Sequence, residues 1–133
     1  SVANRQTYIV SLGQTETYAA IGQEAARVLL KEWLVYFRIG QNTPLPFFAK
    51  TSLAAAEEYS KKEDWDAALR AAYDEFNGKK MSKGQKEYTE VKLVFGHSDE
   101  APLEEPLFEN LVVNLLVPLL NSAAGKNNAT EQE

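Results

Sequence analysis

Apolar and polar residues alternate near the start of the chain, and this pattern predicts a β-hairpin. Residues 7–12 alternate with a period of two and are rich in β-branched and aromatic side chains, and a similar run covers residues 15–21. Both features are typical of strands. Gly13 and Gln14 lie between the two runs and predict a turn. Because a two-stranded hairpin is marginal by itself, we expect it to rest on the helices that follow or to belong to a larger sheet.

Apolar side chains three or four positions apart predict an amphipathic helix over residues 23–39. We expect its apolar stripe to be buried. Gly40 stands where helices commonly end. Pro44 and Pro46 prevent the helix from resuming, because proline fixes φ and lacks an N–H. The predicted stripe consists of Ala26, Leu30, Trp33, Leu34 and Phe37.

A rigid connector with the sequence Pro-Leu-Pro-Phe-Phe covers residues 44–48. Its prolines hold the neighbouring residues extended, and successive side chains in an extended segment point to opposite sides. Phe47 and Phe48 therefore do not readily share one core face. One of them is a candidate interface residue.

Two more amphipathic helices are predicted after the connector. Thr51 or Ser52 can cap a helix that continues to about residue 59, and Asp64 can cap another over residues 65–76. Each tryptophan of the chain lies on the apolar stripe of a predicted helix. Both tryptophans are therefore expected in the core.

The last third of the chain contains one ambiguous segment and one clear helix. Residues 88–95 fit a strand or a short helix, because periodicity does not decide between them. Residues 107–120 predict a helix rich in Leu and Val, and residues 122–133 predict a disordered polar tail. The predicted fold class is α+β, a small N-terminal β-hairpin packed on about four helices, in a single domain over residues 1–121.

Composition limits the possible functions. A chain of 133 residues with a formal net charge of -5 is about one domain long and lacks a broad nucleic-acid footprint. With no Cys and one His, the usual zinc and multi-histidine sites are excluded, and a carboxylate metal site stays open. No cofactor is predicted. His97 precedes Ser98 and Asp99, but catalytic groups must converge in space, so these neighbours predict a loop.

The longest apolar run, residues 111–120, is too short to span a bilayer and contains Asn114 and Pro118. We therefore expect a soluble cytoplasmic protein with no membrane contact. No signal peptide is visible at the start of the sequence. The first residue is Ser1 rather than Met, which suggests an excised fragment.

The order of these segments resembles a known family. Leu-Val-Tyr-Phe-Arg-Ile-Gly at residues 34–40 precedes Pro-Leu-Pro-Phe-Phe-Ala-Lys-Thr at residues 44–51, and an alanine-rich helix follows. This arrangement resembles the C-terminal region of RecC, the gamma chain of exodeoxyribonuclease V in the RecBCD helicase-nuclease. The likeness covers roughly residues 8–120 and is most specific at the connector.

This resemblance implies a nuclease-like (PD-(D/E)xK-related) but inactive module with no catalytic or metal-binding residues. The chain would not be an enzyme by itself but part of the ATP-dependent exodeoxyribonuclease V complex. It would act as a structural and protein-interaction domain in double-strand break repair and DNA-end processing. The implied partners are the RecB and RecD subunits, with DNA only in the assembled complex.

A lysine-rich loop follows the third predicted helix. Four ammonium groups within eight residues produce a local positive potential despite the acidic total. The loop is either a contact to the DNA backbone in the assembled complex or simply hydrated surface, and in the RecC family it tends to be acidic and glycine-rich instead. Its lysines are Lys79, Lys80, Lys83 and Lys86.

Glu90 and Lys92 would share one face if residues 88–95 formed a strand, and such a pair can hold Mg²⁺ and support an attacking water. The site would need another carboxylate on an adjoining strand, and the predicted hairpin offers none in a suitable place. The pair is therefore interpreted as solvated charges. The competing hypotheses are an independent metal-dependent nuclease-like domain and a free-standing helical adaptor unrelated to DNA.

Overall fold

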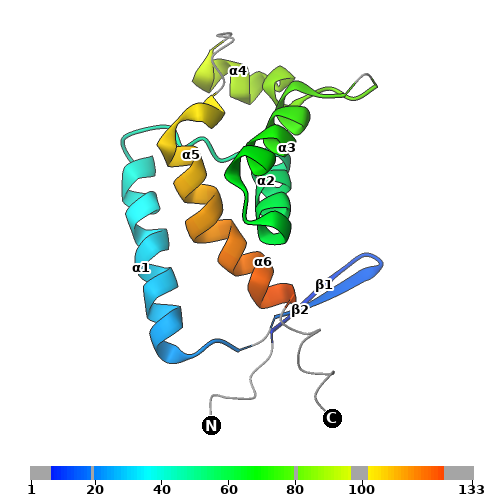
Figure 1. Cartoon of the computed structure of the whole chain (residues 1–133). Coiled ribbons are helices and arrows are strands. Elements are labelled where there is room, and N and C mark those ends of the chain that lie inside the picture. Colours follow the sequence, from blue (N-terminus) through cyan, green and yellow to red (C-terminus); the bar gives the residue numbers. More distant parts are fainter. Residues whose placement is uncertain (1–6, 19, 80, 97–101, 125–133) are drawn as a thin grey trace.

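The computed structural model describes residues 7–18, 20–79, 81–96 and 102–124. They form a set of helices and a two-stranded sheet, which agrees with the predicted α+β class. Figure 1 shows α1 (Gln23–Gly40) alongside the long C-terminal helix, which covers residues 106–124, with α2 (Ala49–Lys62) and α3 (Trp65–Asn77) paired nearby. The elements are β1 (Thr7–Ser11), β2 (Gln14–Tyr18), α1 (Gln23–Gly40), α2 (Ala49–Lys62), α3 (Trp65–Asn77), the 3₁₀ turn η2 (Gln85–Glu87), α4 (Thr89–Phe95), the 3₁₀ turn η3 (Pro102–Glu104), α5 (Pro106–Leu111), the π-helical segment η4 (Val112–Leu116) and α6 (Val117–Ala124).

The predicted hairpin is confirmed. Its strands pair antiparallel from Thr7 opposite Tyr18 to Ser11 opposite Gln14, so the second strand is shorter than expected. β2 contacts α6, and Thr17 is buried there. All five residues of β1 are exposed, so the hairpin rests on the helices through only part of its surface.

The main core lies between α2, α3 and the C-terminal helix. Alanines on α2 and α3 are fully buried, which lets the two helix backbones approach closely. Trp65 packs against Phe108 with ring centroids 5.9 Å apart, so this tryptophan contacts the core as predicted. The buried members of the cluster are Phe48, Ala55, Ala56, Ala68, Ala72, Phe76, Leu103, Phe108, Val112 and Leu116.

α2 begins three or four residues earlier than expected, and the amide groups at its start are satisfied in an unusual way. The N-cap is Phe48, not Thr51 or Ser52, because the extended connector leads directly into the helix. The Phe48 N–H donates to Ser52 Oγ at 3.0 Å. The buried Thr51 N–H donates to the side-chain oxygen of Gln85 at 2.7 Å. A residue 34 positions away therefore completes this helix start. At α3 the prediction is confirmed, since Asp64 accepts from the Asp66 N–H at 3.0 Å.

The C-terminal helix is continuous but widens in the middle. Pro118 lacks an N–H and cannot bond the carbonyl of residue 114, so the helix accommodates it with a π-helical segment. The Val117 N–H donates to the carbonyl of Val112, five residues earlier. The helix continues to Ala124, four residues beyond the end predicted at residue 120. Among the described residues, no helix is long and apolar enough to cross a membrane.

α1 is attached to the domain along a narrow face. Tyr36 is buried against Leu111 and Leu115, and Asn114 Nδ2 donates to the Tyr36 hydroxyl at 3.2 Å. The prediction of a buried stripe on this helix was wrong: Trp33 is 45% exposed and Phe37 is 64% exposed. The stripe exists, but α1 packs on the C-terminal helix with a different face. Amphipathic spacing reveals the stripe without revealing which face meets the rest of the domain.

We predict that Gln85→Ala lowers the free energy of unfolding by roughly 1–3 kcal/mol, because the buried Thr51 N–H loses its acceptor. Urea unfolding followed by circular dichroism measures this loss. Lys86→Ala, an exposed change in the same turn, is the control and should alter stability by no more than about 0.5 kcal/mol. Equal effects of the two changes would show that the hydrogen bond between Thr51 and Gln85 does not stabilise the fold.

Candidate interaction surface

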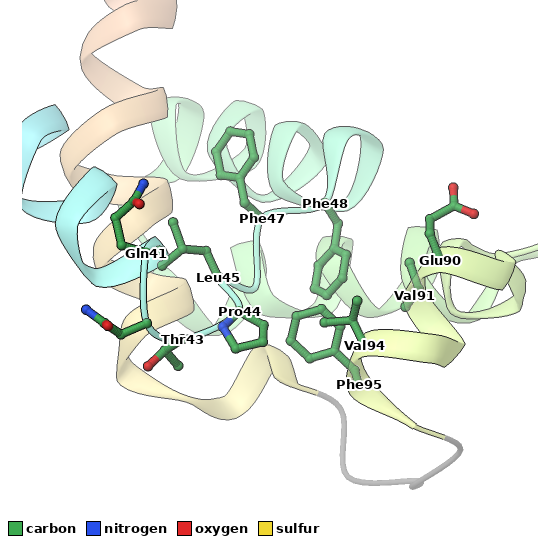
Figure 2. A pocket seen from close by; sticks show the side chains of 12 residues that line it. Gln41, Thr43, Pro44, Leu45, Phe47, Phe48, Glu90, Val91, Val94 and Phe95 are labelled. Atoms are coloured by element: carbon green, nitrogen blue, oxygen red, sulfur yellow. The ribbon is translucent and has the colours of Figure 1, made fainter.

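The two phenylalanines of the connector have different environments. Phe48 is 5% exposed, and its ring centroid lies 5.1 Å from that of Phe76 and 5.2 Å from that of Phe95. Phe47 is 44% exposed, and Figure 2 shows the two side chains on opposite sides of the chain. Of the two candidate interface residues, Phe47 is therefore the one that offers surface to a partner.

The backbone of the connector turns tightly where it enters the core. Pro46 is fully buried, and the Phe47 N–H donates to the carbonyl of Leu45 at 2.7 Å, which closes a three-residue turn around the proline. Proline's fixed φ suits this turn. The turn and the buried Phe48 together fix the direction in which Phe47 projects.

An open groove of about 580 Å³, the connector groove, lies between the connector and α4 (Figure 2). Residues 40–45 and Phe47 form one wall, Phe48 contributes to the lining, and the opposite wall is formed by Glu90, Val91, Val94 and Phe95. Val94 is 54% exposed, so both walls carry accessible apolar surface. The connector groove can accept apolar side chains of a protein segment, and it is the candidate interaction surface of this part of the chain.

The lysine-rich loop is held in shape at its base by two glycines in close contact. Gly78 has a φ of +82°, and a Cβ there would lie 2.4 Å from the Gly84 nitrogen. A Cβ on Gly84 would lie 2.2 Å from the carbonyl oxygen of residue 76. Only glycine permits such an approach. The loop therefore presents Lys79 and Lys83, both exposed, from a closed base.

Of the other two lysines predicted as possible DNA contacts, the structure describes only Lys86. Lys86 is exposed on η2, directly after the tethering residue Gln85. Lys80 lies outside the described residues. Of the four candidates, the structure thus places three on the same surface segment.

The ambiguous segment is helix α4, which separates Glu90 from Lys92. Residues two positions apart on a helix point about 200° apart, so the shared face required for a nuclease pair does not form. Lys92 Nζ instead donates to Glu87 Oε2 at 2.7 Å, and this hydrogen bond lowers the pKa of the Glu87 carboxyl. The described part of the chain contains no group of three or more His, Cys, Asp or Glu side chains that could hold a metal ion. His97, Ser98 and Asp99 lie outside it.

Sequence reasoning missed three long-range polar contacts. Two are the hydrogen bond from the Thr51 N–H to Gln85 and the hydrogen bond from Asn114 to Tyr36. The third joins the Tyr73 hydroxyl to Glu104 Oε1 at 2.5 Å; burial and this hydrogen bond raise the pKa of Tyr73 to about 12. Asn114 alone left a signal, since it interrupts an apolar run.

The N-terminal part of the chain is similar to a known family. Residues 6–60 match the family model of the RecC C-terminal domain. The match covers less than half of the chain, so it shows a likeness of this segment to that domain. The match contains the hairpin, α1, the connector and most of α2, so it confirms the RecC resemblance for these elements. No curated protein and no solved structure matches the chain.

The different environments of the two connector phenylalanines predict different losses of stability when each ring is truncated. Phe48→Ala should lower the free energy of unfolding by roughly 3–5 kcal/mol, because it removes a buried ring from the core. Phe47→Ala serves as the matched control and should cost less than about 1 kcal/mol. Urea unfolding of both variants measures the difference. Equal destabilisation would contradict the separate environments of the two rings.

Proposed function

We propose that this chain is a non-catalytic structural and protein-interaction domain of a RecC subunit, acting within RecBCD in double-strand break repair and DNA-end processing. RecB and RecD are the proposed partners. The observation that carries the proposal is the family match over residues 6–60. The RecC resemblance of the later segments, noted from the sequence, supports extending it to the rest of the domain.

The distribution of apolar surface supports an interaction role. Most of the exposed large apolar side chains lie in the family-matched segment, on the hairpin, on α1 and at Phe47. The part of the chain after residue 60 supplies much of the buried core. Contiguous exposed apolar surface commonly marks a protein contact. The family-matched segment therefore has the surface expected of a subunit-interaction module.

An independent nuclease is the less favoured alternative. The pair formed by Glu90 and Lys92 is split by the helical geometry of α4, and Lys92 is engaged with Glu87. The proposal of an inactive nuclease-like module derives from the RecC resemblance. The proposed assignment is a subunit domain of the exodeoxyribonuclease V complex that is not an enzyme by itself.

DNA contact in the assembled complex is the second part of the proposal. The observation that favours it is the closed glycine base, which holds exposed lysines in a defined loop. Among the described residues, Lys79 and Lys83 take part in no ion pair, so their ammonium groups are available to phosphates. The loop differs in charge from its family counterpart, and a contact made by it would be particular to this chain.

The interaction role predicts that the chain is captured by separately expressed RecB or RecD. Phe47→Ala should weaken that capture about fivefold or more, since an exposed aromatic ring at an interface is a typical hot spot. Biolayer interferometry of purified proteins measures the affinity. Leu53→Ala, with a similar exposure of 41%, is the control and should leave the affinity unchanged. Absence of binding to both subunits would reject the proposed function.

The DNA contact predicts that charge reversal weakens binding in a salt-dependent way. In the assembled complex, Lys79→Glu with Lys83→Glu should weaken binding to a duplex end. The slope of log affinity against log salt concentration should decrease in magnitude by about 1 for each phosphate that the loop no longer neutralises. Lys50→Glu with Lys61→Glu makes the same charge change on exposed residues elsewhere. If the two double variants behave alike, the loop makes no specific contact with DNA.

A further inference from the structure

The outer face of α1 carries a continuous apolar stripe that the domain does not cover. Successive residues of an α-helix are rotated by about 100° about its axis, so the stripe residues fall within a sector roughly 100° wide. This sector lies beside the face through which Tyr36 and Ile39 contact the domain. Figure 1 shows α1 at the edge of the molecule, with the C-terminal helix on one side. The large stripe residues are exposed by 45–64%: Leu30, Trp33, Leu34 and Phe37.

A basic row borders this stripe on its free side. Arg27, Lys31 and Arg38 fall within about 40° of each other on the helix and are all exposed. None of them forms an ion pair with another described residue. Glu24 adds one acid at the N-terminal end of the row. The flank is therefore net positive in a chain whose formal charge is -5.

The combination of stripe and basic row fits an amphipathic helix of opposite charge. We propose that the outer face of α1 binds an acidic amphipathic helix of a partner protein. Its apolar residues would cover the stripe, with Trp33 and Phe37 as anchors, and its Asp and Glu side chains would face the basic row. This helix-binding proposal extends the proposed function. It rests on that function in one respect, because it requires the domain to have a protein partner.

Charge and geometry disfavour a second copy of this chain as the occupant. In an antiparallel pair of identical helices, equivalent flanks face each other, so the basic row would meet itself. In a parallel pair, the basic row would face the opposite flank of the second α1. That flank adjoins the face through which Tyr36 contacts the C-terminal helix. The partner helix must therefore differ from α1 in charge.

Two designed helical peptides test the proposal. Both carry the same leucine stripe, and the polar positions hold Glu in one peptide and Lys in the other. Fluorescence anisotropy of the labelled peptides with the full chain at low salt measures affinity. The acidic peptide should bind about tenfold more tightly than the basic one, and this advantage should shrink as salt screens the charges.

Variants of α1 locate the binding face. Arg27→Glu with Lys31→Glu and Arg38→Glu should reverse the preference, so that the basic peptide binds more tightly. Leu30→Ala with Phe37→Ala should weaken both peptides. Val28→Ala with Val35→Ala is the matched control, because these valines are 52% and 50% exposed but lie off the stripe. Because all these side chains are exposed, the variants should keep the wild-type circular dichroism spectrum.

Several results would overturn the inference. These are equal binding of the two peptides by the wild-type chain, a preference that survives the triple charge reversal, or a wild-type dimer in sedimentation that Phe37→Ala dissociates. Capture by RecB or RecD without a peptide preference would reject this inference and leave the proposed function standing. A peptide preference without capture would reject the RecB and RecD assignment and support the docking face.

Discussion

The buried start of α2 is the constraint on which the remaining structure depends. The connector enters the core through Pro46 and Phe48, and Thr51 in the first turn of α2 is fully buried. A buried N–H without an acceptor is costly, and Gln85 supplies one for Thr51. That hydrogen bond connects the connector, α2 and η2. It also sets the position of α4, which follows η2 directly and forms the far wall of the connector groove.

The C-terminal helix is the second organising element, because α1, α2 and the hairpin all contact it. Its π-helical segment contains Asn114, which bonds Tyr36 on the buried face of α1. This contact is confined to a small cluster. α1 is therefore held along one side, and its wide apolar stripe remains accessible to the proposed partner helix.

The family-matched segment and the remaining chain have different structural roles. The segment of residues 6–60 holds the exposed hairpin, the outward stripe of α1 and Phe47, whereas α3, α5 and η4 complete the core behind α2. Such a division is consistent with the proposed interaction role, because the core stabilises the module while the family-matched segment presents apolar surface. The lysine-rich loop adds a separate charged surface. The base of this loop depends on the close approach of Gly78 and Gly84.

Local sequence patterns were enough to predict the hairpin, the order of the helices, the Asp64 cap, the interruption of the helix before the prolines and the RecC resemblance. These follow from local spacing, capping and backbone restriction, which act over a few residues. The packing of distant segments determines that the α1 stripe faces outward, that residues 89–95 are helical, and that Gln85 completes the start of α2. Each outcome depends on which distant segment packs against which face, and a period of hydrophobic residues contains no information about the partner of that face.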